Sequence, residues 1–396
     1  MSRLRAPAPE DFTSRLRGLA ITARVGLWLG VCFGVAFLTG LISHYAQNID
    51  QPVPFPTWPA WGYRFTQGLH VLAGTMAVPL LLVKLWSVYP KLFERPPRDL
   101  RDLALEVLER LSIGALVASA IFMLASGLAN AAQWYPWAFS FRRTHYAVAW
   151  VAIGALVLHI AVKIQLVRRG WAEPIDGPNL TQTPTGQNPT GQDPAGPDDG
   201  GLSRRGLLRA TWSAAGVAAL ATAGAAVPWL RKVSIFAVRS GEGPQGVPIN
   251  KSAAAAGVEE SARAVDYRLT LVHADRTVSL TRDDLAGMTQ RTEHLPIACV
   301  EGWSASGDWT GVRLRELLDL VDAPRNSTVQ VTSLQQRGPF RATTLQGNFA
   351  DDDHTLLALA LNGAELNLDH GYPARLIAPN RPGVLQTKWV TRIEVV

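Results

Sequence analysis

The chain is poor in cysteine: only Cys32 and Cys299 occur among 396 residues. Neither belongs to a Cys-x-x-Cys or Cys/His finger spacing, which argues against a structural zinc site. The sequence also has no glycine-rich dinucleotide motif after a strand and no defensible catalytic triad, so nicotinamide chemistry and hydrolysis are disfavoured. A lone cysteine such as Cys299 most often packs as a small apolar residue, and metal ligation or nucleophilic chemistry are the alternatives.

Charged residues are scarce as well, at 18% of the chain, below the roughly 25% of ordinary soluble domains. This deficit indicates membrane segments. The formal net charge is +6, but the arginines gather at the ends of apolar runs instead of along one face. The charge pattern therefore indicates membrane topology and no nucleic-acid partner.

Four apolar runs precede residue 170, and each approaches the roughly 20 residues that a helix needs to cross a bilayer. They cover Gly26–Ser43, Gly68–Trp86, Leu111–Ala129 and Tyr146–Val167. Basic residues before the first run and after the second and fourth place those ends in the cytoplasm. We therefore expect residues 1–170 to form an all-α transmembrane four-helix bundle.

A second boundary follows. Residues 171–202 are rich in Pro, Gly, Gln, Asn and Asp, which predicts a disordered cytoplasmic linker. Twin arginines, Arg204 and Arg205, then precede the weakly apolar run Ala210–Leu230. This resembles a twin-arginine (Tat) export signal, although an ordinary helix flanked by positive charge explains the same two arginines. We expect residues 203–232 to form a fifth, anchoring helix.

The last domain is expected at residues 233–396, where the pattern changes from about residue 260 to short alternating stretches separated by Gly, Pro, Asn and Asp, such as 267–272, 328–332 and 375–378. This pattern predicts strands joined by turns. Helices are expected at Arg313–Val321 and His354–Leu361, which gives an α+β domain.

Three blocks in this domain carry a resemblance. They are Cys-Val-Glu-Gly-Trp-Ser at 299–304 with Trp-Thr-Gly at 309–311, Asp-His-Gly-Tyr-Pro-Ala-Arg-Leu at 369–376, and Lys-Trp at 388–389. In this order they resemble the molybdopterin domain of the sulfite oxidase superfamily, particularly the branch that includes bacterial methionine sulfoxide reductase catalytic subunits. The resemblance implies a sulfite-oxidase-type fold, Mo-molybdopterin as cofactor and oxygen-atom transfer as chemistry.

The resemblance also implies roles for single residues. Cys299 matches the thiolate ligand of molybdenum, His370 and Arg375 match contacts to the pterin and its phosphate, and Lys388 matches a basic phosphate contact. Ser333 aligns with a hydroxyl residue near the cofactor. From charge type and proximity alone, we add Asp308, Arg337 and Arg341 as candidates for a substrate entrance, with Arg341 and Asp308 as catalytic candidates.

Four histidines lie in the membrane half: His44, His70, His145 and His159. Their placement resembles the membrane cytochrome b subunits of formate dehydrogenases and nickel-iron hydrogenases, which implies one haem b held by His70 and His145. His44 is a rival ligand. His159 stands ~21 Å along the same helix from His145, but the family's partner position, within 18–28, contains no histidine. A second haem is therefore open, and interfacial histidines bonded to water or headgroups remain the alternative.

Together these features predict a multi-pass cell-membrane protein with an extracytoplasmic catalytic domain. Electrons would pass between quinone, haem and molybdenum, and the expected substrate is a small sulfoxide-type or other oxo compound. Sulfite-type oxidation is the alternative reaction. A non-catalytic binding domain with a merely structural Cys299 is the alternative class, and a transmembrane electron carrier would need two haems.

Overall fold

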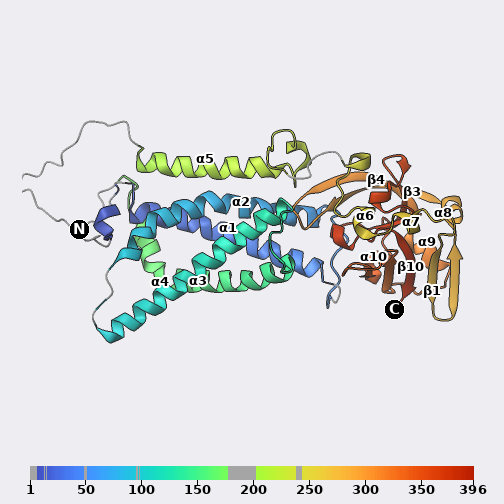
Figure 1. Ribbon diagram of the computed structural model, residues 1–396, viewed down its shortest axis with the longest axis horizontal. Coiled ribbons are helices and arrows are strands. Elements are labelled where there is room, and N and C mark those ends of the chain that lie inside the picture. The colour runs from blue at the N-terminus through green and yellow to red at the C-terminus, as the bar shows by residue number, and fades with distance from the viewer. Residues whose placement is uncertain are drawn as a thin grey trace, which may run out of the picture. The chain divides into compact units, whose positions relative to one another are not determined.

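The computed structural model describes residues 7–12, 14, 16–48, 51–94, 97, 99–176, 202–237 and 243–396. As far as they are described, these residues form two compact units. The first comprises residues 1–37, 72–130 and 134–220, and the second comprises residues 38–71, 131–133 and 221–396. Figure 1 follows the chain through both units by colour. The predicted linker at 171–202 lies outside the described residues except at 171–176 and 202.

Among the described residues four helices are long and apolar enough to cross a membrane, which confirms the predicted set of spans. They are α1 (Leu19–Ala46), α2 (Gly62–Val88), α3 (Leu100–Ala131) and α4 (Phe141–Ala172). A helix that is apolar on all sides belongs in a bilayer or a large core. Large apolar side chains such as Leu82, Val151 and Val157 are exposed on these helices, as a lipid-facing surface requires.

The first unit packs around the start of α1. Ile21, Val25 and Cys32 of α1 are buried with Ala77 and Leu80 of α2. Cys32 therefore behaves as a small apolar residue, which is the usual fate of an unreactive cysteine.

The helix expected after the linker is present as α5 (Arg204–Ala223), shorter than the predicted 203–232. Trp212 packs edge-on against Trp28 of α1 with ring centroids 5.0 Å apart. Arg204 donates to the carbonyl oxygen of Ile175, and Arg205 pairs with Asp176 at 2.6 Å. Among the described residues α5 is not one of the four membrane candidates, so its role as an anchor stays a prediction, as do the predicted domain bounds.

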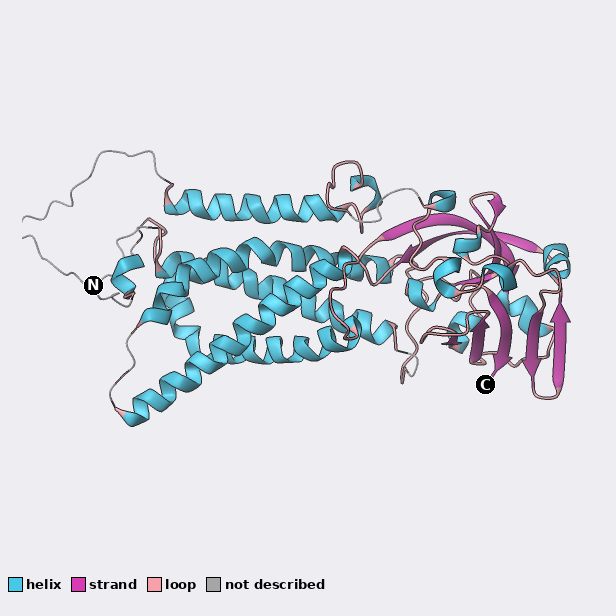
Figure 2. Cartoon of the chain, in the orientation of Figure 1, coloured by secondary structure: helices cyan, strands magenta, loops and turns pink. Residues whose placement is uncertain are grey.

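The second unit contains two five-stranded sheets, shown as magenta arrows in Figure 2. The first sheet has the order β2-β1-β10-β5-β6, with β1 and β10 parallel and the other pairs antiparallel. The second has the antiparallel order β3-β4-β7-β8, and β9 also pairs with β7. The strand bounds are β1 (Leu269–His273), β2 (Arg276–Leu280), β3 (Gln290–Ala298), β4 (Ser304–Arg313), β5 (Val329–Ser333), β6 (Ala342–Leu345), β7 (Leu356–Leu361), β8 (Ala364–Glu365), β9 (Arg375–Ile377) and β10 (Val390–Val395).

Short helices precede β1 or connect later strands, and they complete the α+β domain. They are α6 (Ala253–Ala256), α7 (Glu259–Ala262), α8 (Arg282–Gly287), α9 (Leu314–Asp319) and α10 (Gly347–Ala350). The α+β fold class and the helix expected near 313–321 are thereby confirmed.

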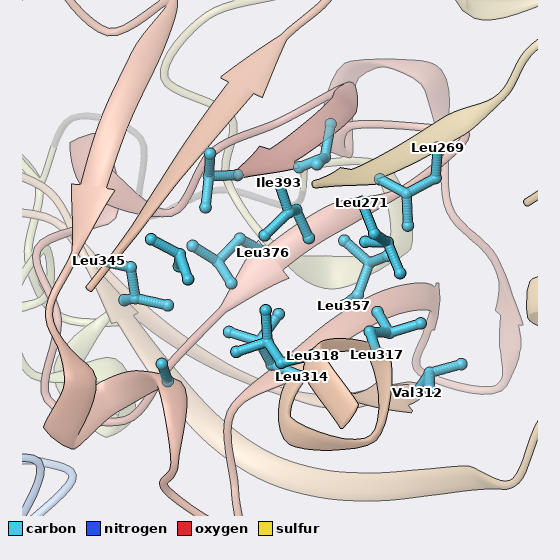
Figure 3. Packing of buried hydrophobic residues seen from close by; sticks show 14 of the residues in the cluster. Leu269, Leu271, Val312, Leu314, Leu317, Leu318, Leu345, Leu357, Leu376 and Ile393 are labelled. Carbon is cyan, nitrogen blue, oxygen red and sulfur yellow. The ribbon is translucent and has the colours of Figure 1, made fainter. Parts of the chain in front are cut away.

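The main core lies between the two sheets and is closed by α9 (Figure 3). Leu269 and Ile393 of the first sheet meet Leu357 and Leu376 of the second there, while Leu356 and Ala358 belong to a separate buried cluster. Strand β7 is thus covered on both faces. A doubly covered strand reads as a continuous apolar run without alternation. This explains why the expected helix at His354–Leu361 was wrong.

Candidate functional site

Cys299 lies on the five-residue turn that joins β3 to β4. Its N–H donates to the carbonyl oxygen of Trp303, and its own carbonyl accepts from Gly302, whose φ is +90°. A positive φ of this size favours glycine, so the Gly in Cys-Val-Glu-Gly-Trp closes the turn. The Cys299 side chain is 2% exposed, and its Sγ lies 3.6 Å from Oε2 of Glu301.

Glu301 gathers several donors beside this thiol. Its Oε2 accepts from Nε1 of Trp303 at 3.0 Å and from Nε2 of Gln133 at 2.6 Å. Hydrogen bonds to the charged form of a carboxylate hold it in place. The turn is therefore fixed by the side chain of Trp303 at its own end and by that of Gln133 from the α3–α4 connection.

A second loop, residues 378–388, lies against the Cys299 turn. A Cβ on Gly383 would lie only 3.0 Å from the carbonyl oxygen of Ala298, so glycine allows this close approach. Gln386 closes the loop by accepting from the N–H of Ala378 and donating to the carbonyl oxygens of Ala378 and Arg381. Arg381 is 5% exposed within this loop.

Arg375 and His370 form a buried polar group around Trp309. The Arg375 side chain is 2% exposed, its Nη1 donates to the His370 carbonyl oxygen, and its guanidinium lies 5.1 Å from the Trp309 ring centroid. Trp309 Nε1 donates to the carbonyl oxygen of Leu295 on β3, four residues before Cys299. Trp309 and Cys299 also share one apolar cluster. This cluster connects the Cys299 turn with the Arg375 group.

The charges in this group are strongly affected by burial. Burial, with the nearby charge of Arg375, lowers the pKa of His370 to about 4, against a raising effect of the bond to Pro244. Its Nε2 donates to the Pro244 carbonyl oxygen at 2.6 Å, so Nδ1 is the unprotonated nitrogen of the neutral ring. Burial also lowers the pKa of Arg375 and of Arg381 to about 9. Both guanidinium groups remain charged at neutral pH.

Lys388 and Ser333 lie together at the edge of the same group. Ser333 Oγ donates to the carbonyl oxygen of Lys388 at 2.7 Å. Lys388 Nζ donates to the carbonyl oxygens of Lys251 and Asp369, the residue before His370. The structure therefore brings Ser333, Lys388, His370 and Arg375 into one neighbourhood.

Asp308 and Arg341 are exposed, unlike the buried Cys299 turn, and their catalytic role stays a prediction. Asp308 lies four residues along β4 from Ser304, about 14 Å at the usual strand rise. Its side chain is 57% exposed and pairs with His294 at 2.7 Å. Arg341 is exposed on the loop before β6, where its carbonyl oxygen accepts from Ser333, and Arg337 is exposed on the same loop. The charges of these three residues suggested a substrate entrance. Charge type alone does not predict where the fold places a side chain.

An elongated anionic cofactor with a thiolate-bound metal fits the residues that are present. Within the described part of the chain, several buried polar atoms have no hydrogen-bond partner: Nε of Arg375, Nε of Arg381, Nδ1 of His370 and Oγ of Ser304. Burying cationic groups without an anion is costly. A phosphate suits the planar fork of a guanidinium, because two parallel hydrogen bonds can form. The donor set therefore fits a phosphate and pterin, and the buried Cys299 thiol is of the soft type that would suit the metal.

Sequence reasoning missed Arg381, Glu301 and Gln67. Arg381 lies eleven residues after His370, in the turn Asn-Arg-Pro-Gly. This turn close to the Asp-His-Gly block was a signal that could have identified Arg381. Gln67 donates to the carbonyl oxygen of Val300 at 3.2 Å from α2. No pattern in the sequence links these two segments, since only tertiary contact places α2 beside the Cys299 turn.

The four histidines are distributed over both units. In the second unit His44 lies on α1, and His70 on α2 has Nδ1 3.3 Å from Oγ1 of Thr39. In the first unit His145 of α4 has Nδ1 3.0 Å from Oγ of Ser126 on α3. His159 lies further along α4. An Nδ1 that is hydrogen-bonded fixes the ring orientation, which is the usual arrangement behind an Nε2 metal ligand.

Comparison with known families agrees with both halves of this geometry. Residues 255–396 match the oxidoreductase molybdopterin binding domain, and residues 23–165 match the prokaryotic cytochrome b561 family. The chain is a fusion of these two domains. It therefore carries a molybdenum-dependent oxidoreductase domain, with Mo-molybdopterin and haem b as its cofactors, which confirms the predicted cofactors.

Curated relatives resemble parts of the fusion. Sulfite oxidase of Arabidopsis thaliana is 33% identical over 113 residues, covering 24% of this chain and 29% of the relative. The putative protein-methionine-sulfoxide reductase subunit YedZ1 of Azospira oryzae is 29% identical over 115 residues, covering 29% and 43%. The protein-methionine-sulfoxide reductase catalytic subunit MsrP of Ralstonia nicotianae is 31% identical over 140 residues, covering 32% and 41%. The chain spans less than half the length of these curated relatives.

Proposed function

We propose that this fusion reduces a sulfoxide-type substrate with electrons taken from membrane quinol. One observation carries the proposal: a single chain joins a cytochrome b561 domain to a molybdopterin domain. The relatives include both a putative subunit and the catalytic subunit of protein-methionine-sulfoxide reductases. In such a chain electron supply and substrate reduction are encoded together.

Molybdenum held by the pterin would supply two-electron oxygen-atom transfer. In the proposal Cys299 is the protein ligand of the metal, and its turn keeps the thiol buried away from water. Arg375 and Arg381 offer fixed guanidinium donors to the phosphate, while Lys388 adds positive charge beside them. His370 donates from Nε2 to Pro244 and keeps Nδ1 available as an acceptor for the pterin.

Haem b would be bound by His70 and His145, with His44 as the rival ligand and His159 as the candidate for a second haem. Four apolar helices support a membrane protein. The cell membrane, the extracytoplasmic position of the second unit and export through the Tat machinery belong to the proposal, and they rest on the basic residues and the twin arginines. The quinone pool belongs to it as well, and it rests on the cytochrome b561 match.

Sulfite-type oxidation is the second candidate reaction. It is favoured by the 33% identity to the sulfite oxidase of Arabidopsis thaliana. In that case electrons would leave through the haem to quinone, and the same residues would hold the cofactor.

The deciding experiment begins with molybdenum and iron per chain, measured on protein purified in mild detergent from a host that makes molybdopterin. We expect one molybdenum and one iron, and two irons would show that His159 has a partner. Dye-driven sulfoxide reduction and dye-linked sulfite oxidation are then compared on the same preparation. Faster sulfite oxidation would reverse the proposed direction.

The two cysteines provide a matched pair of variants. Cys299→Ala should abolish both reactions, whereas Cys32→Ala, at a buried site in the helical unit, should leave them near the wild-type rate. Iron without molybdenum in a well-folded preparation, or full activity in Cys299→Ala, would instead support a non-catalytic binding domain.

A further inference from the structure

The end of α1 and the start of α2, within residues 38–71, belong to the same compact unit as the molybdopterin domain. Three residues of α2, spaced by one helical turn, contact the last residue of β3 and two residues of the Cys299 turn. Tyr63 packs with Ala298, Gln67 donates to the carbonyl oxygen of Val300, and Val71 lies where a Cβ on Gly302 would be 2.7 Å from its Cγ2. Positions i, i+4 and i+8 lie on one face of a helix, so this face of α2 packs against the turn.

A buried polar cluster fixes the orientation of that face. It consists of Ser43 and Gln47 of the α1 end with Tyr63 and Gln67 of α2, all of which are buried. Ser43 Oγ donates to Oε1 of Gln67 and lies 3.1 Å from the Tyr63 hydroxyl. Nε2 of Gln47 donates to Ser43. Since Ser43 holds Oε1, the amide nitrogen of Gln67 is directed to Val300. A fully connected network of this kind holds one geometry.

Further contacts hold the α1–α2 loop to the sheets of the same unit. Asn380 accepts from the N–H of Tyr63 and donates to the carbonyl oxygen of Pro56. Arg64 donates to Oγ of Ser306 at 3.1 Å, and Asn348 donates to the carbonyl oxygen of Phe55. The contact at the Cys299 turn is thus part of a broad, mostly polar seam.

His70 lies one turn after Gln67 and directly before Val71. Its ring is held against α1, since a Cβ on Gly40 would lie 3.1 Å from its Cε1. The residue proposed to bind the haem is therefore a neighbour of the two side chains that contact Val300 and Gly302.

We propose that the α2 turn from Gln67 to Val71 is the electron-entry contact of the molybdopterin domain. This inference rests on the proposed function. Electrons pass from the haem at His70 to the Cys299 turn through the Gln67–Val300 hydrogen bond and the Val71–Gly302 contact. Quinol gives up two electrons and two protons, the electrons cross singly, and the sulfoxide takes up two electrons and two protons. Its sulfur–oxygen bond breaks, and sulfide and water leave.

The test separates electron entry from substrate reduction. The variant Gln67→Met keeps a side chain of similar length but lacks the amide, and Val71→Ala removes the methyl groups that touch Gly302. Thr66→Ala is the matched control, because the Thr66 hydroxyl donates within the helix to Tyr63. Haem in each purified protein is reduced anaerobically, mixed with dimethyl sulfoxide, and its reoxidation is followed by absorbance, beside viologen-driven sulfoxide reduction.

We expect haem reoxidation to slow about tenfold in Gln67→Met, equivalent to ~1.4 kcal/mol in the barrier, and to slow less in Val71→Ala. Viologen-driven reduction, molybdenum content and the haem spectrum should match Thr66→Ala. Unchanged haem reoxidation in both variants would overturn the inference, and an equal loss of viologen-driven reduction would assign Gln67 to the metal site instead. If the wild type shows no viologen-driven reduction, the proposed function fails, whatever the variants do.

Discussion

At the scale of residues, the site is marked by buried polar atoms that the described protein leaves unpaired. Arg375, Arg381 and His370 each carry such an atom, and all three are buried in the second unit. Burial of cations without an anion costs free energy, so this arrangement is expected where a ligand completes the hydrogen bonding. Cys299 differs from these residues, because its thiol has a partner: its position is set by the turn and by Oε2 of Glu301.

Arg375→Lys should weaken cofactor retention. Lysine keeps the charge but loses the planar fork that can grip a phosphate with two hydrogen bonds. Weakening a buried charged contact costs on the order of 2–5 kcal/mol. We expect little molybdenum to remain after gel filtration, while haem content stays at the wild-type level.

The matched control is Arg341→Lys, because Arg341 is an exposed arginine of the same domain. Equal molybdenum in both variants would show that Arg375 does not hold the cofactor.

His370 predicts a defined pH dependence of stability. Its pKa falls from 6.5 to about 4 on folding, so between these values the unfolded chain binds the proton more strongly. The contribution of His370 to the free energy of unfolding is therefore complete above pH 6.5 and is lost as the pH falls towards 4. At 1.36 kcal/mol per pKa unit, the loss is roughly 3 kcal/mol.

His370→Gln should flatten this profile, since glutamine offers a donor near Pro244 but does not titrate. Thermal unfolding of the second unit, measured in steps from pH 7 to 4, checks the difference. Parallel profiles for the wild type and the variant would refute the assignment.

At the scale of elements, the site depends on close backbone contact between strands. Gly311, the glycine of Trp-Thr-Gly on β4, lies where β4 and β7 shift register. A Cβ there would be 2.1 Å from the carbonyl oxygen of Leu357. The motif glycine is thus explained by strand packing, which also sets the position of Trp309 beside Arg375.

Gly311→Ala should destabilise the second unit by about 3 kcal/mol, at the upper end of overpacking costs, because the clash is with backbone. Gly287→Ala is the control, since no atom lies within 4 Å of a Cβ at that position. Thermal unfolding of both variants checks the prediction, and similar midpoints would contradict it.

Asn380 should hold the α1–α2 loop in place. Its φ of +53° suits asparagine or glycine, so Asn380→Gly removes the side chain without backbone strain. Loss of its bonds to Tyr63 and Pro56 should cost about 1–3 kcal/mol. We expect faster proteolysis within residues 51–61, followed by mass spectrometry, and an unchanged rate would show that the loop is held by other contacts.

At the scale of the whole molecule, the two units should respond differently to loss of the molybdenum cofactor. A ligand that binds only the folded state stabilises it by mass action. Protein made in a host without molybdopterin should therefore show a lower unfolding midpoint for the second unit, while the midpoint of the first unit stays the same. An equal drop in both midpoints would show that the units are not independent in stability.

The sequence by itself determined the four spans and the α+β class, because hydropathy and residue patterns are local properties. It placed Cys299 on its turn for the same reason. The two cofactors followed from the resemblance of its short ordered motifs and histidine placement to known families. The order of residues along the chain does not show which side chains come into contact. Tertiary structure therefore decided three features: the seam between α2 and the Cys299 turn, the burial of Arg381 and the exposure of Asp308. The strand at Leu356–Leu361 shows the limit most clearly: an apolar run fits either a helix or a strand until a second sheet covers its other face.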